Sequence, residues 1–368
     1  MDNELLNEIH LMRNHSERTQ TIYRYALKKY TDFCSMSMEE LLEEAELEED
    51  KGIKWKKRKL KRRLLTFRQH LLQDYSLNTM YVVMRPVIAI YKYYEIEVFE
   101  LPPVNKKNVD TPAPVRFSDL PDKEILRKAI NIANPLMKAI IYLMVSSGCA
   151  KREILNFTIG DYITSLCDYT KKTNIYDIIE DLGDAENVIP TFNLRRQKTD
   201  KYYTTYCTPE AVNAINSYLL SRTDQLTEDK PLFKVNLAYF SELFAKINDE
   251  LGLGKVGTYN RFRSHMLRKF HASALYNDGM SLDNVNDLQG KAKNKTDASY
   301  FMTNPDDLKT EYIRHIHAVT LNKEVEKLSI KSPEFVQMEN ENREYKSKLD
   351  KLADDMARIM KRLPDEAK

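Results

Sequence analysis

Residues 265–300 read HMLRKFHASALYNDGMSLDNVNDLQGKAKNKTDASY. Within this stretch His265 and Arg268 lie three residues apart, and this spacing puts two side chains on one face of a helix. Lys291 and Tyr300 follow after a second apolar segment. The rest of the chain is interpreted outward from these four residues.

Two helices are predicted in this stretch. In the first, apolar residues recur at helical spacing and Gly279 provides a natural end. In the second, which ends at Gly290, the inward side is again apolar. The residues expected to point inward are Phe270, Ala274, Leu275, Leu282, Val285 and Leu288.

Cations together with a phenol suit chemistry on a phosphate diester. Arginine and lysine bind phosphate oxygens, and a tyrosine can act as a covalent nucleophile. The alternative is ordinary: a lone HxxR on a helix is usually a surface or capping pair, and a lone tyrosine usually packs in a core. The catalytic interpretation therefore depends on what the rest of the chain supplies.

The composition indicates a mostly helical protein of two or three domains. The chain has 368 residues, 30% of them charged and 42% hydrophobic, with a net charge of only +2, so the distribution of charge matters more than its sum. Glycine is scarce, at 9 residues, and no run of 18 apolar residues predicts a membrane span. The first residues show no apolar signal core.

The four cysteines, Cys34, Cys149, Cys167 and Cys207, show no CxxC spacing. This argues against a zinc site or a disulfide framework and favours a reducing cytoplasm. No phosphate-binding GxxxxGK[ST] motif and no metal-ligand spacing is present. We therefore expect a cytoplasmic, nucleoid-associated protein that needs no cofactor and no metal.

Residues 1–103 are predicted to form an all-helical domain of four or five helices. There the acidic run MEELLEEAELEED is followed by the basic run IKWKKRKLKRRLLTFRQHLL, whose apolar stripe is expected to face inward and its cations outward. Clustered cations bind DNA phosphates by releasing counterions; alternatively, they offset the acidic run. The candidate DNA-binding residues are Lys56, Lys57, Lys59, Arg62 and Arg63. Pro86 is expected to kink the last helix of this domain or to move its start.

A polar, proline-containing linker is predicted over residues 104–115, and a second, mostly helical domain over 116–320. Its most apolar helix, PLMKAIIYLMVSSGC, should be buried and end at Gly148. The segment VIPTFNLRRQKTDKYYTTYCTPEA alternates on both sides of a KTDK turn, which predicts a β-hairpin with Lys198 at its tip.

Taken together, these motifs resemble the tyrosine recombinase (phage integrase) family over residues 16–318. The family has a lysine on a hairpin turn and a helix with an HxLR motif. It also has a glycine followed by His or Trp, and the nucleophilic tyrosine stands nine residues after that His or Trp. Lys198, the segment HMLR, Lys291 and Tyr300 match in order and spacing, although the family has His or Trp where Lys291 stands. The resemblance implies a mainly α fold: a SAM-like core-binding domain, then a helical catalytic domain with a small antiparallel β-sheet.

A second departure from the family pattern is more serious. The family's first arginine belongs to a GLRxxEL segment, and in the matching segment SSGCAKREIL its place is taken by Ala150. Either the turn shifts by a residue, so that Lys151 or Arg152 reaches the phosphate, or the site is impaired. An empty position could cost on the order of 10²–10³ in rate, as for other lost donors to a transition-state charge.

The activity implied by the resemblance is site-specific cutting and rejoining of double-stranded DNA, as in the integrase of a mobile element. Tyr300 would form a 3′-phosphotyrosyl link while Arg268, with Lys151 or Arg152, holds the phosphate. Lys198 would protonate the leaving oxygen, His265 would serve as acid–base partner, and Lys291 would add a donor. The alternatives are a DNA-binding protein of the same fold with impaired chemistry, and a type IB topoisomerase-like strand transferase.

Residues 321–368 are predicted to form a C-terminal helix. From Glu334 apolar residues recur in a heptad pattern, with Asn342 at one seam position, which predicts a short coiled coil and self-association as a dimer or tetramer on DNA. The alternative is an amphipathic helix that folds back on its own catalytic domain. Light scattering of a chain truncated at Ser332 distinguishes the two.

Overall fold

The computed structural model describes residues 2–105, 115–196, 201–291 and 303–322. The chain divides into two compact units, Met1–Ala113 and Pro114–Lys368, and each is described by itself. Lys198, Tyr300 and the predicted C-terminal heptads lie outside the described residues.

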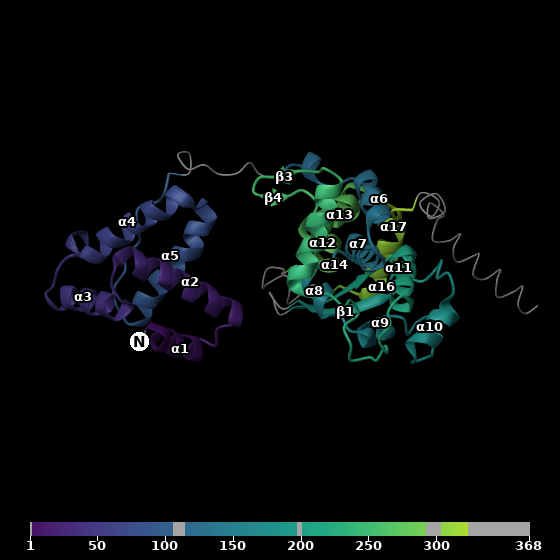
Figure 1. The fold of residues 1–368 in the computed structure, drawn as a ribbon, viewed down its shortest axis with the longest axis horizontal. Helices are drawn as coiled ribbons and strands as arrows, with labels where there is room; N and C mark the ends of the chain where they lie inside the picture. Colours follow the sequence, from purple (N-terminus) through teal and green to yellow (C-terminus); the bar gives the residue numbers. More distant parts are fainter. Residues whose placement is uncertain (1, 106–114, 197–200, 292–302, 323–368) are drawn as a thin grey trace, which may run out of the picture. The chain divides into compact units, whose positions relative to one another are not determined.

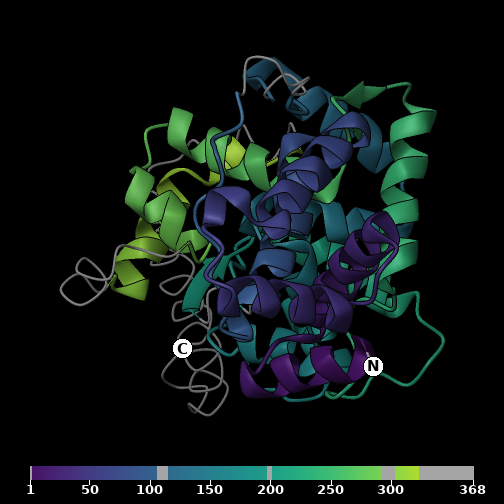
Figure 2. The same ribbon diagram turned by 90° about the vertical axis from the view of Figure 1, so that its left-hand side faces the viewer.

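The first unit is entirely helical in its described part. Its helices are α1 (Asp2–Met12), α2 (Glu17–Cys34), α3 (Met38–Asp50), the 3₁₀ turn η1 (Trp55–Lys57), α4 (Lys59–Asp74) and α5 (Leu77–Tyr93). They run in several directions around a shared core (Figure 1 and Figure 2). At its centre the phenol oxygens of Tyr30 and Tyr91 lie 3.0 Å apart, so α2 and α5 are joined by a buried hydrogen bond.

Two details of this unit were not determined by the sequence-based expectations. Helix α1 was not predicted, and it buries Leu5, Leu6 and Ile9. Pro86 lies inside α5 and does not move its start, because the Ser76 side chain caps the helix by accepting from the Thr79 N–H.

The second unit carries the candidate site. Its helices are η3 (Phe117–Asp119), α6 (Lys123–Ile132), α7 (Pro135–Ser147), α8 (Lys151–Asn156), α9 (Ile159–Ser165), α10 (Ile175–Leu182), α11 (Pro209–Leu220), α12 (Leu237–Glu250), α13 (Ser264–Asn277), α14 (Leu282–Leu288), α16 (Pro305–Arg314) and α17 (Ile316–Val319). Helix α7 is buried almost all round and packs against α11 and α13 (Figure 1). As predicted, it ends at Gly148, which adopts a left-handed conformation.

Two short hairpins complete this unit. Strands β1 (Thr191–Arg196) and β2 (Lys201–Tyr206) pair antiparallel, with Arg196 opposite Lys201 at the end of the ladder next to residues 197–200. This confirms the predicted hairpin and the fold class, mainly α with a small antiparallel sheet. Strands β3 (Lys255–Val256) and β4 (Tyr259–Asn260) form a second hairpin that was not predicted.

The described part of the opening stretch, residues 265–291, folds largely as predicted. Helix α13 ends just before Gly279, whose φ of 107° only glycine adopts easily. The inward direction expected for Leu282 is wrong, because this first residue of α14 is 57% exposed. Among the described residues no helix is both long and apolar enough to cross a membrane.

Candidate active site

Helix α13 positions His265 and Arg268, and Arg268 is the more tightly held of the two. Its guanidinium is buried, at 7% exposure, and donates to the backbone carbonyls of Gly148 and Gln289. The Gln289 side chain returns a hydrogen bond to the Arg268 carbonyl at 2.9 Å. Arg268 is therefore fixed between the end of α7 and the end of α14 before any ligand binds.

One carboxylate accompanies this arginine. Glu153 on α8 is buried, and its Oε2 lies 3.8 Å from the Arg268 guanidinium. The same oxygen accepts from the Ala150 N–H, so Glu153 also holds the first turn of α8 in place. The carboxylate thus compensates the buried charge of Arg268 only in part, because it is shared.

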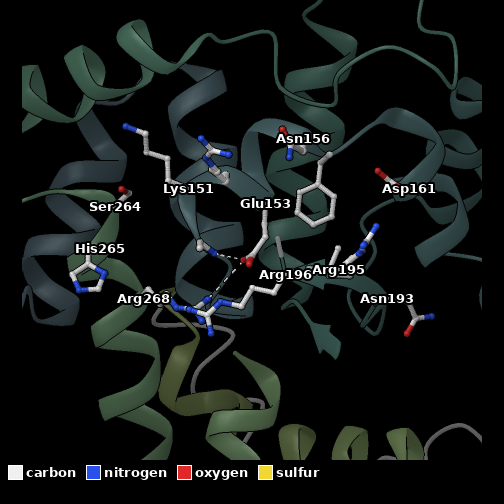
Figure 3. A pocket seen from close by; sticks show the side chains of 14 residues that line it. Lys151, Glu153, Asn156, Asp161, Asn193, Arg195, Arg196, Ser264, His265 and Arg268 are labelled. Atoms are coloured by element: carbon white, nitrogen blue, oxygen red, sulfur yellow. Dashed lines mark hydrogen bonds and ion pairs between the residues drawn. The ribbon is translucent and has the colours of Figure 1, made fainter. Parts of the chain in front are cut away.

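The segment around Ala150 does not bring Lys151 toward Arg268. Lys151 donates to the Ser241 hydroxyl at 2.7 Å, and its ammonium lies 5.4 Å from the centroid of the Phe240 ring. Figure 3 shows its side chain directed away from Arg268. Arg152 lines the cavity in front of α8. Of the two cations expected to replace the missing arginine, Lys151 is therefore engaged elsewhere.

Side chains of the β1–β2 hairpin form hydrogen bonds with the turn after α14. Arg196 Nη1 donates to the Gly290 carbonyl at 2.9 Å. Lys201 Nζ lies 3.2 Å from both the Asp287 carboxylate and the Lys291 carbonyl. The hairpin tip, which carries Lys198, lies outside the described residues, but the strands that lead to it are anchored beside Arg268.

Two cavities open around these residues. The first, of about 470 Å³, lies in front of α8 and β1, and the second, of about 510 Å³, lies over α13 and the Gly290 turn. The side chains common to both linings are Arg196, His265 and Arg268. Figure 3 shows the Arg196 side chain extending toward Arg268.

The second cavity is strongly cationic. Its lining includes Arg116, Arg196, Arg268, Lys269 and Lys291, and no carboxylate is among the described residues that line it. Burial and the neighbouring Arg268 and Arg196 lower the pKa of Lys291. Burial, Lys269 and the arginines around it lower the pKa of His265, which keeps the imidazole neutral and able to accept a proton near neutral pH. An anion is the ligand that such a lining favours.

Tyr300, the predicted nucleophile, belongs to the segment between the described Lys291 and Thr303. The next tyrosine along the chain, Tyr312, is fully buried on α16, and its hydroxyl donates to the Ser146 carbonyl at 2.9 Å. Burial raises the pKa of Tyr312 well above its ordinary value. Tyr312 is thus a structural residue, in keeping with the preference for Tyr300.

The cations proposed for the first unit fall into two groups. Lys56, Lys57 and Arg62 are exposed. Lys59 and Arg63 pair with Glu44, and the Arg63 side chain is only 17% exposed. The expectation that the basic run faces outward is therefore wrong for Arg63, which pairs with a carboxylate of α3, and for Arg58 and Arg68, which are each 9% exposed.

Several residues of the site were not singled out from the sequence. They are Gln289, which exchanges hydrogen bonds with Arg268, Glu153, which lies 3.8 Å from it, and Arg196, which borders the same two cavities. Arg196 had a weak signal, since it stands two residues before Lys198 in the quoted hairpin. Among the described residues no group of three or more His, Cys, Asp or Glu side chains is arranged to hold a metal ion.

Comparison with solved structures identifies the fold. The chain is similar to the XerH site-specific recombinase bound to palindromic difH substrate in a post-cleavage complex, with 18% identity, a TM-score of 0.51, and coverage of 84% of this chain and 83% of that one. The Tn1549 transposon integrase in complex with a circular intermediate DNA gives 13% identity, a TM-score of 0.47, and coverage of 84% and 98%. No protein-family model and no curated protein matches the sequence. The fold is that of the tyrosine recombinases.

Proposed function

We propose that this protein is a site-specific DNA recombinase or integrase that cuts and rejoins double-stranded DNA through a covalent link to Tyr300. The observation that carries the proposal is the meeting of two cavities at Arg196, His265 and Arg268 beside Lys291. A buried, pre-positioned guanidinium in a cationic cavity is suited to a phosphate diester. The fold shared with a recombinase of known substrate supports the same proposal.

In the proposed reaction the Tyr300 oxygen attacks the scissile phosphorus. A phosphorus–oxygen bond to Tyr300 forms as the bond to the 5′-oxygen breaks, leaving a 3′-phosphotyrosyl link and a free 5′-hydroxyl. His265 takes the proton from the phenol, and Lys198 gives a proton to the departing oxygen. Arg268 and Lys291 hold the non-bridging oxygens, where charge builds up in the transition state. Attack by another 5′-hydroxyl reverses the steps and joins a new partner.

One observation favours a second candidate, a DNA-binding protein with impaired chemistry on this fold. Ala150 offers no charge at the first-arginine position, and Lys151 is directed away from Arg268. The two candidates differ in whether a covalent adduct forms.

Trapping on nicked DNA separates them. The full chain is incubated with a pool of duplexes that carry a nick at a fixed place within random sequence, so that the short 5′-hydroxyl strand diffuses away after cleavage. An active recombinase gives protein–DNA adducts that survive denaturation, leave the 5′ ends of the DNA free, and disappear in Tyr300→Phe. A protein that retains duplexes from the pool without any adduct is a binder, and the proposed activity is then wrong.

A further inference from the structure

The end of strand β1 places a second arginine beside Arg268. Arg196 lines both cavities at their junction, together with His265 and Arg268. Arg152 lines the first cavity but not the second, and Lys151 is held by Ser241. Among the described cations near Ala150, Arg196 is thus the one that borders both cavities together with Arg268.

The two guanidinium groups are held by the same turn. Arg196 donates to the Gly290 carbonyl and Arg268 to the adjacent Gln289 carbonyl. Two like charges fixed this close repel each other, and burial, together with the presence of Arg268, lowers the pKa of Arg196. Glu153 offsets this repulsion only in part, because its carboxylate lies 3.8 Å from Arg268 and also accepts a hydrogen bond from the Ala150 N–H.

An anion that bridges the two guanidinium groups would relieve the repulsion between their charges. A phosphate diester has two non-bridging oxygens, and each guanidinium can donate to one of them while it keeps its backbone contact. Ala150 lines the same first cavity, so the space left by its small side chain adjoins Arg196.

We propose that Arg196 replaces the arginine that is missing at Ala150 and, with Arg268, forms a two-arginine clamp on the scissile phosphate. This inference rests on the proposed function for its reaction, but the clamp itself requires only a phosphate ligand.

The test compares two substrates built on a sequence recovered from the trapped pool. One has an ordinary scissile phosphate, and in the other a methyl group replaces one non-bridging oxygen, which removes the negative charge. With the ordinary phosphate, Arg196→Ala should form adducts on the order of 10²-fold more slowly than the wild type, as expected when a donor to a transition-state charge is removed. With the neutral substrate, wild type and variant should react at similar rates, because the charge that Arg196 would meet is gone.

Matched variants separate the clamp from a merely structural role. Arg196→Gln removes the charge but keeps a polar side chain and should behave as Arg196→Ala does, while Arg195→Ala, whose guanidinium lies 5.7 Å from the centroid of the Tyr202 ring, should retain nearly wild-type rates. A decrease in Arg196→Ala that is equally large on both substrates would show that Arg196 only supports the Gly290 turn. Wild-type rates in Arg196→Ala, or a charge-dependent decrease in Arg152→Ala instead, would also overturn the clamp.

A second measurement does not depend on cleavage. Thermal unfolding of the full chain is followed by calorimetry in inorganic phosphate and in chloride at equal ionic strength. Phosphate should raise the midpoint of the second unit more in the wild type and in Arg195→Ala than in Arg196→Ala or Arg268→Ala. If no adduct forms but this difference is found, the clamp stands and the proposed activity fails. If adducts form but Arg196→Ala responds to phosphate as the wild type does, the activity stands and the clamp fails.

Discussion

Arg196 and Arg268 are anchored on consecutive backbone carbonyls, those of Gly290 and Gln289, although the two arginines come from a strand and a helix far apart in sequence. The turn after α14 therefore sets the spacing of both guanidinium groups. A change in this turn is therefore expected to move both guanidinium groups.

Gly290→Ala is expected to disturb both arginines at once. Gly290 has a φ of +57°, and an added Cβ would lie 2.5 Å from the Tyr203 ring. Strain and overpacking together should cost about 2–4 kcal/mol in the second unit and abolish most DNA cleavage. Calorimetric unfolding and the adduct assay measure the two effects.

Gly252→Ala is the matched control for this substitution. Gly252 has a similar φ of +60° but nothing within 4 Å of an added Cβ, so it should cost only about 1 kcal/mol and leave cleavage unchanged. The fluorescence of Trp55, the single tryptophan, reports on the first unit and should be unaffected by either substitution. Equal destabilisation in the two variants would contradict a role for the Tyr203 contact.

Stability is expected to fall in acid because of His271. This side chain is fully buried on α13 against Gly148, and burial lowers its pKa to about 3. The unfolded chain takes up the proton near pH 6.5, whereas the folded chain does not, so stability present above pH 6.5 is lost progressively as the pH falls toward 3. Between pH 6.5 and 5 the free energy of unfolding should fall by about 2 kcal/mol because of this group.

His271→Gln removes the titrating group. Urea unfolding of the second unit at pH 7 and pH 5 should show a smaller acid-induced destabilisation in the variant than in the wild type, whatever the absolute stability of the variant. The same pH dependence in both proteins would mean that another group carries the effect.

Lys198→Ala should be rescued by a better leaving group. If Lys198 protonates the departing 5′-oxygen, replacement of that oxygen by sulfur makes protonation unnecessary, since a thiolate leaves readily without a proton. The variant should therefore cleave an ordinary substrate on the order of 10²-fold or more slowly and the 5′-thio substrate at nearly the wild-type rate. Lys201→Ala serves as a comparison, because Lys201 is paired with Asp287. If the 5′-thio substrate rescued Lys201→Ala and not Lys198→Ala, Lys201 would be the general acid.

The basic run of the first unit is expected to act through its exposed cations. Replacement of Lys56, Lys57 and Arg62 by Ala should weaken binding to duplex DNA and flatten the dependence of log K on log salt by about 0.9 for each phosphate that is no longer neutralised. Arg63→Ala breaks the ion pair with Glu44 and should lower the stability of the first unit with little change in the salt slope. A salt slope that changes only in Arg63→Ala would reverse this assignment.

Local patterns were sufficient to predict much of the fold. The apolar run of α7, its end at Gly148, and the alternation on both sides of the β1–β2 turn are properties of short segments, and the structure confirms them. The split between α8 and α9 is less visible, because it depends on Phe157, whose ψ of 133° interrupts the helix, and on the Thr158 cap with Asp161. Periodicity across six or seven residues does not reveal such a break.

Only part of the site could be predicted from the sequence, and the reason is physical. His265 and Arg268 share one helix and so have a fixed spacing, whereas Arg196 reaches the site through a hydrogen bond to a residue 94 positions away. Nothing in the hairpin sequence distinguishes Arg196 from Arg195, whose guanidinium lies 5.7 Å from the centroid of the exposed Tyr202 ring instead. Both arginines line the first cavity, but only the packing against Gly290 shows that Arg196 is the one at the junction of the two cavities.

The central claim, covalent chemistry at Tyr300, is tested most directly by finding which residue carries the DNA. Adducts trapped on the nicked pool are digested with protease and nuclease, and the modified peptide is identified by mass spectrometry. The prediction is a single phosphotyrosyl peptide that contains Tyr300. A link at any other of the 22 tyrosines, or DNA that is cut without any protein-linked phosphate, would contradict it.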